Sequence, residues 1–220
     1  MSKDEQIKKD VTDQLYWDSR VDASDVDISV QDGVVTLSGT VPSFRSLDAA
    51  YDDAVTVVGV LRVVNDLTID YTTVVNLPTD DELEISVNET LRTNPDVESS
   101  EIDVTVNTGV VTLEGTVPTY WQKLDAETTA SRLLGTTEVV NNLGVVPSDK
   151  LSDKMIAEDI IAALDRNIMV DTNDIDVEVE EGVVTLSGTV ASGYIRDLVF
   201  DAAVYTSGVV DVIDSLVIEV

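Results

Sequence analysis

A nonapeptide that occurs three times constrains the fold of this chain more than any other feature. Residues 33–41 read Gly-Val-Val-Thr-Leu-Ser-Gly-Thr-Val, and the same sequence returns at 109–117 and 182–190 with Glu114 as the single change. A further glycine follows each copy at the same distance, as Gly59, Gly135 and Gly208. A fixed period of this kind is the signature of a repeated supersecondary unit. We therefore predict three modules: module 1 over residues 1–72, module 2 over 76–148 and module 3 over 149–220.

The modules are small, and the composition removes several kinds of site. A domain of 60–70 residues buries only about 60% of its unfolded surface, so we expect the modules to pack on one another. The 220-residue chain contains no cysteine and no histidine. Disulfides and thiolate metal sites are thereby excluded, and the commonest general base and metal ligand is absent.

The chain carries a formal charge of −30, from 43 acidic and 13 basic residues. Such a surface repels nucleic acid and, at low salt, anionic lipid. We therefore predict no nucleic-acid partner and only weak, non-specific association with cations. The composition also suits molar salt, where the Debye length falls to about 3 Å. Two interpretations stay open, an ordinary acidic protein or a protein of a host with a salty cytoplasm.

The N-terminal segment is polar and contains no apolar signal region, and no later run is long enough to span a membrane. We therefore expect a soluble, cytoplasmic protein.

Hydrophobic spacing predicts five elements in each module. A helix comes first, because apolar residues recur at i, i+4 and i+8, as in Ile7, Val11 and Leu15. An alternating strand, a turn of the form Asp32-Gly33 and the nonapeptide then predict a β-hairpin. A second helix follows, and then a last strand that we expect to lie parallel to the nonapeptide strand. The predicted fold class is α+β: three tandem αββαβ modules, each a three-stranded mixed sheet packed by two helices on one face.

Capping residues and glycines give finer predictions. Ser2-x-x-Glu5 and Thr79-x-x-Glu82 have the form of capping boxes at helix starts. The third apolar-face position of the nonapeptide strand is always glycine, which we interpret as space for a helix to approach the sheet closely. We expect the glycine that follows each second helix to end that helix in a left-handed conformation. The residues concerned are Gly39, Gly115 and Gly188 in the strands and Gly59, Gly135 and Gly208 after the helices.

A family resemblance rests on the segments from Val26 to Val41 and from Gly59 to Leu67 and on their counterparts in the other modules. The pattern is V-x-V-x-x-G-V-V-T-L-x-G-T-V, a helix with small residues, and then G-V-x-x-V-x-N-x-L. It resembles the BON domain, a family named from osmotically induced and nodulation proteins of bacteria. The resemblance implies an αββαβ fold and a non-catalytic module linked to osmotic or envelope stress, proposed to bind phospholipids or partner proteins. The chain is similar to a triple-repeat, cytoplasmic branch in which a helix-end pair like Trp17-Asp18 occurs.

No residue pattern predicts catalysis or cofactor binding. The sequence has no glycine-rich phosphate loop and no nucleophile elbow. We also expect no acidic residue within an apolar run that would raise its pKa. Asp171-x-Asn173-Asp174-x-Asp176-x-Glu178 resembles an acidic calcium loop, but the residues between these acids alternate as in a strand. We therefore predict a non-enzymatic protein with no cofactor and no defined metal site.

Aromatic residues interrupt the repeat at five positions, which form our candidate interaction surface. Tyr16-Trp17 closes the first helix of module 1, Tyr120-Trp121 opens the second helix of module 2, and Tyr194 takes the position of Trp121 in module 3. One interpretation is packing between modules, and the other is an aromatic anchor for a partner or a lipid. The arginines are too scattered for a polybasic lipid patch.

The sequence thus favours a binding or scaffold protein that acts through module surfaces on a protein partner, in osmotic or general stress. The alternative is a peripheral phospholipid-binding protein, which the resemblance also implies.

Overall fold

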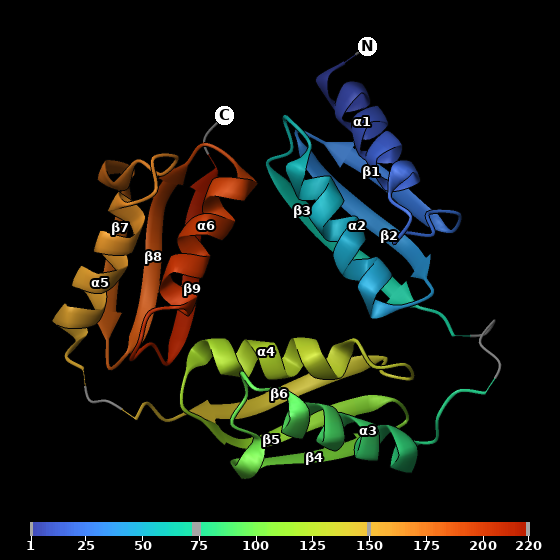
Figure 1. The fold of residues 1–220 in the computed structure, drawn as a ribbon. Helices are drawn as coiled ribbons and strands as arrows, with labels where there is room; N and C mark the ends of the chain where they lie inside the picture. Colours follow the sequence, from blue (N-terminus) through green and yellow to red (C-terminus); the bar gives the residue numbers. More distant parts are fainter. Residues whose placement is uncertain (1, 72–75, 149–150, 219–220) are drawn as a thin grey trace. The chain divides into compact units, whose positions relative to one another are not determined.

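The structure, a computed structural model, describes residues 2–71, 76–148 and 151–218 (Figure 1). It divides into two compact units, one formed mainly by module 1, with residues Ser192–Tyr194 added, and the other by most of modules 2 and 3. The elements of module 1 are α1 (Lys3–Trp17), β1 (Val26–Gln31), β2 (Val34–Val41), α2 (Phe44–Thr56) and β3 (Arg62–Ile69).

Modules 2 and 3 repeat this order, each with a short 3₁₀ turn added before its first strand. Module 2 consists of α3 (Asp80–Thr93), η1 (Ser99–Glu101), β4 (Ile102–Asn107), β5 (Val110–Val117), α4 (Tyr120–Ser131) and β6 (Glu138–Val145). Module 3 consists of α5 (Asp153–Asp165), η2 (Thr172–Asp174), β7 (Ile175–Glu180), β8 (Val183–Val190), α6 (Gly193–Val204) and β9 (Asp211–Ile218). In the segment that resembles a calcium loop, Asp171 caps η2, Asn173 and Asp174 lie in η2, and Asp176 and Glu178 lie in strand β7.

Each sheet has three strands, with the nonapeptide strand in the centre. β1 pairs with β2 in antiparallel fashion, and β2 pairs with β3 in parallel, so that Leu37 faces Ile28 on one side and Asn65 on the other. The other two modules have the same pairing and register. A parallel pair needs a long crossover, which α2 supplies. The α+β class and the αββαβ module are confirmed.

The core of each module lies between its sheet and its two helices, which share one cluster (Figure 1). In module 1 the α1 stripe of Ile7, Val11 and Leu15 is buried with Val35 and Leu37 of β2. Burial of each such side chain stabilises the fold by about 1.5–3 kcal/mol. The interior of module 1 is thus mainly apolar, and Ser46 and Asp53 of α2 are buried polar residues at its edge, between the helices.

The capping boxes are present at α1 and α3, where Ser2 and Thr79 accept from the amides of Glu5 and Glu82. The turns between the first two strands have positive φ at both central residues, 50° at Asp32 and 79° at Gly33 in module 1. These angles match the hairpin turn that the sequence predicts.

A carboxylate from the first turn of each module's first helix holds this hairpin turn. Asp4 Oδ2 accepts from the Asp32 amide at 2.9 Å, and Asp4 Oδ1 accepts from the Gly33 amide at 3.0 Å. Asp80 does the same in module 2 and Asp153 in module 3. We call this arrangement the hairpin clamp. Nothing in the sequence analysis anticipates it.

The explanation that we gave for the strand glycines is wrong. Gly39 has a φ of 110°, and a Cβ atom there would lie 2.1 Å from the backbone oxygen of Asp25, not against a helix. The same oxygen accepts from the amide of Thr40 at 3.1 Å. Glycine is required because the strand adopts a left-handed φ where the preceding loop bonds to its backbone. Gly115 and Gly188 are in the same situation.

The glycines after the second helices also differ from expectation. They have positive φ as predicted, but α2 ends at Thr56, and Val57, not Gly59, is its C-terminal cap. Gly59 lies in the following turn, where an added Cβ would be 3.3 Å from Ile7 Cδ1 of α1. The close approach of a helix that we assigned to the strand glycines thus occurs here.

Candidate functional site

The aromatic pair of module 1 lies on the surface at the C-terminal end of α1. Tyr16 is 75% exposed and Trp17 is 80% exposed. Their rings meet edge to face, with centroids 5.3 Å apart. Large aromatic side chains exposed together present apolar area that a partner can cover. We call these two residues the aromatic pair.

The aromatic residues of module 2 lie in different surroundings. Tyr120 is only 8% exposed and belongs to the hydrophobic cluster of module 3, while Trp121 packs against the same cluster, with its ring 6.1 Å from that of Tyr205. Burial, and then the negative charge of Asp211, raise the pKa of Tyr120 to about 12. Tyr120 and Trp121 therefore pack inside the unit formed by modules 2 and 3. Tyr194 is the second residue of α6 and is 47% exposed.

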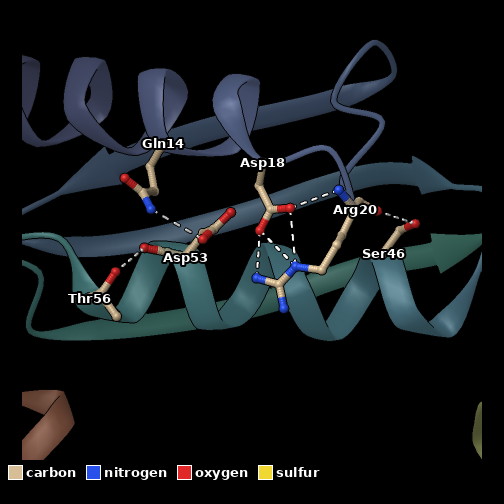
Figure 2. A network of polar contacts seen from close by, with 6 residues as sticks. All are labelled: Gln14, Asp18, Arg20, Ser46, Asp53 and Thr56. Carbon is tan, nitrogen blue, oxygen red and sulfur yellow. Dashed lines mark hydrogen bonds and ion pairs between the residues drawn. The ribbon is translucent and has the colours of Figure 1, made fainter.

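Directly after the aromatic pair in the sequence, the chain forms a bidentate ion pair (Figure 2). Asp18 caps the end of α1, and its carboxylate accepts from Arg20 Nε at 2.9 Å, from Arg20 Nη2 at 2.5 Å and from the Arg20 backbone amide at 2.7 Å. These bonds lower the pKa of the Asp18 carboxyl to about 2. The backbone oxygen of Arg20 in turn accepts from the hydroxyl of Ser46 in α2 at 2.9 Å. The end of α1 is thus tied to the start of α2.

A buried carboxyl completes this network. Asp53 of α2 is 6% exposed, and its Oδ1 accepts from Gln14 Nε2 of α1 at 3.3 Å. Its Oδ2 is buried, and no hydrogen bond to it is found in the described part of the chain. Burial raises the pKa of Asp53, and the nearby Asp18 carboxylate adds to the rise. Our expectation that no acidic residue lies among apolar positions was therefore wrong.

The sequence contained a signal for Asp53 that was missed. It lies on the same buried stripe of α2 as Ala49, Ala50 and Ala54, at a position where the helical period calls for a small or apolar residue. Asp18 was noted only as part of the Trp-Asp pair. Gln14 and Arg20 carry no signal of their own, because their role depends on the packing of α1 against α2.

The chemistry available in this network is limited. The pKa of Asp53 is raised by burial and that of Asp18 is lowered by Arg20, and the other side chains of the network are amide, guanidinium and hydroxyl groups. Among residues 2–71, 76–148 and 151–218 no group of three acidic side chains is placed to hold a metal ion. In the same residues no helix is long and apolar enough to cross a bilayer. The network joins the end of α1, next to the aromatic pair, to α2.

Comparison with known families decides the relationship of the chain. The family profile of the BON domain matches residues 3–71, 79–147 and 152–219. The chain belongs to the BON domain family. Its three tandem BON domains confirm the resemblance seen in the sequence. BON domains are known in stress-related and binding proteins.

Similar solved structures add little to this assignment. One is CdsD, a structural protein of the type III secretion system of Chlamydia trachomatis, with 13% identity over 97% of this chain and 92% of that chain and a TM-score of 0.26. A second is the C-terminal domain of CdsD, with 14% identity, full coverage of both chains and a TM-score of 0.26. Similarities at this level carry no functional inference. A comparison with curated proteins gives no match.

Proposed function

We propose that this BON protein is a non-enzymatic binding and scaffold protein whose aromatic pair, Tyr16 and Trp17, anchors a protein partner with a basic segment. The observation that carries the proposal is the exposure of both rings, 75% and 80%, on a helix end held by Asp18 and Arg20. Tyrosine and tryptophan are enriched among the few residues that carry most of the binding energy at protein interfaces.

The charge of the chain supports a basic partner. With a net charge of −30, the protein attracts cationic segments over several ångströms at low salt. Lysine or arginine over the face of an exposed tryptophan or tyrosine adds about 0.5–1 kcal/mol. The charge thus favours encounter, and the aromatic pair supplies the contact.

An arginine-rich peptide and the intrinsic fluorescence of Trp17 test the proposal. The chain has two tryptophans, so the fluorescence titration is made in a Trp121→Phe background, with Tyr16→Ala as the variant. Trp17→Ala removes the fluorophore, so its binding is measured by the anisotropy of a labelled peptide. We expect at least tenfold weaker binding for each variant. Val58→Ala is the matched control, because Val58 is a 92% exposed apolar residue of the same module. Unchanged affinity in both aromatic variants would show that the charge acts alone and that the aromatic pair is no anchor.

The exposed rings also support the second candidate, a peripheral phospholipid-binding protein, because tyrosine and tryptophan suit the interface between water and lipid. The charge of −30 opposes anionic headgroups at low salt. Flotation with vesicles of neutral and of anionic phospholipid, each in dilute and in molar KCl, tests this candidate. No flotation in any of the four mixtures would eliminate it.

We place this activity in the cytoplasm under osmotic or general stress, a role supported by the family and by the acidic composition. Deletion of the gene in the native host, followed by an upshift in salt, is the test. Growth equal to that of the parent strain would count against the role in osmotic stress.

A further inference from the structure

The side chains that bridge the two helices of a module differ among the three modules. In module 1 the Gln14 amide of α1 donates to the Asp53 carboxylate of α2 at 3.3 Å. In module 2 the Asn94 amide, just after α3, donates to Asp125 Oδ2 of α4 at 2.7 Å. In module 3 the repeat places alanines at both positions of the module 1 pair. Side chains thus bridge the helices in two modules, and a bridge of the module 1 type is impossible in the third.

Module 3 has a hollow of about 440 Å³ between α5 and α6, and Ala163 and Ala202 line it. Leu198 and Val199 stand where module 1 has two alanines, and Val199 is fully buried. Because of these larger side chains, α5 and α6 come less close to each other than the helix pairs of modules 1 and 2. The volume lies within the range of about 300–1,000 Å³ that is typical of small-molecule sites.

The hollow is lined by groups of both charges on an apolar floor that includes Leu164. Arg166 lies just after α5, while Asp159 of α5 and Asp201 of α6 provide carboxylates. Within the described residues none of these three groups forms an ion pair. Burial raises the pKa of Asp201. The positive and the negative groups of the hollow are thus not paired with each other, and a ligand that carries both charges can pair with both.

Asn167 adds a hydrogen-bond donor to the same hollow. Its Oδ1 accepts from the Met169 amide at 3.1 Å, the arrangement that also orients Asn94 in module 2. Asn94 Nδ2 then donates to the carboxylate of Asp125, but module 3 has Leu198 in place of that acid. In the described part of the chain Asn167 Nδ2 donates to no protein group. A carboxylate brought by a ligand can take the place that Asp125 has in module 2.

We propose that the hollow of module 3 binds a small zwitterionic solute, a molecule with a carboxylate and an alkylated ammonium group on a short carbon chain. The carboxylate accepts from Asn167 and Arg166. The ammonium group lies between the Asp201 carboxylate and the ring of Tyr205, which also lines the hollow and can stabilise a cation through its face. This proposal does not depend on the aromatic pair of module 1 or on the partner proposed for it.

Titration of the full chain with glycine betaine, followed by NMR of the Asn167 side-chain amide, tests the proposal. We expect saturable shifts of that signal with glycine betaine, and much smaller shifts with acetate or with tetramethylammonium alone, because each of these offers one half of the ligand. Absence of a shift at the highest betaine concentration would overturn the proposal. Equal affinity for either half would also overturn it, since the site would then bind a single charge.

The filled variant Ala163→Gln/Ala202→Asp reproduces the module 1 pair and removes the hollow. We expect at least tenfold weaker binding of betaine to this variant, and unchanged binding to the control Glu158→Gln, which alters an exposed charge of α5 outside the hollow. Asn167→Ala, with one small change of volume, gives the same answer if the filled variant does not fold; because it lacks the reporter amide, its binding is followed through the methyl signal of the betaine. Wild-type affinity in Asn167→Ala would show that the solute does not bind here.

Discussion

Replacement of Asp80 by asparagine tests the hairpin clamp most directly. Asp80 accepts from the Thr108 amide at 2.7 Å and from the Gly109 amide at 3.0 Å. Asparagine has nearly the same shape, but it keeps one acceptor and places a donor against the second amide. A hydrogen bond to a charged group contributes about 1.5–3 kcal/mol, and the lower end applies here because Asp80 is partly exposed. We therefore expect Asp80→Asn to destabilise the turn by about 2 kcal/mol.

The assay is hydrogen exchange at the amides of Thr108 and Gly109. A loss of about 2 kcal/mol in local opening speeds exchange by about thirtyfold, at 1.4 kcal/mol for each factor of ten. Asp81→Asn is the matched control, because Asp81 is the next residue in the same helical turn, carries the same charge and is exposed. We expect exchange at both amides to be unchanged in this variant. Equal acceleration in the two variants would mean that general charge, and not the clamp, protects the turn.

Three further predictions concern stability. Asp53→Asn should raise the free energy of unfolding of module 1 at pH 7 by on the order of 1 kcal/mol, because it removes a buried charge. Denaturation across pH should show that the wild type becomes more stable as the pH falls through the raised pKa of Asp53, and that the variant does not. Gly39→Ala should lower the free energy of unfolding by about 2 kcal/mol or more, because of its φ of 110° and the nearby Asp25 oxygen. Gly144→Ala, whose added Cβ would be 3.7 Å from its nearest neighbours, should lower it by under about 1 kcal/mol, as measured by thermal melting. Equal losses in the two variants would contradict the backbone explanation. The melting temperature should rise with KCl, since salt screens the repulsion from a charge of −30, and a value that stays constant from dilute to molar salt would refute this.

The backbone plan could be predicted from sequence because its determinants are local. The stripe of Ile7, Val11 and Leu15 sets a helix, and the positive φ at Asp32 and Gly33 sets a hairpin, each within a few residues. The parallel pairing of β2 and β3 then follows from chain connectivity.

What could not be predicted depends on groups brought together from distant parts of the chain. The helical period places Asp53 on the buried stripe of α2, but its contact with Gln14 depends on α1 lying against that stripe, and no pattern within α2 predicts this contact. The strand glycines were assigned the wrong neighbour because the direction of a Cβ atom changes with φ, which periodicity cannot give. The hollow of module 3 became visible only when the helix pairs of the three modules were compared in space.

The clamp also has a consequence for the order in which a nascent chain gains structure. Asp4 and the turn that it holds are separated by 28 and 29 residues, so the carboxylate leaves the ribosome well before the amides that it binds. The first helix of each module can form early, but its carboxylate binds the turn amides only after the following hairpin has emerged. During translation the hairpin clamp should therefore form three times in succession, once for each copy of the nonapeptide.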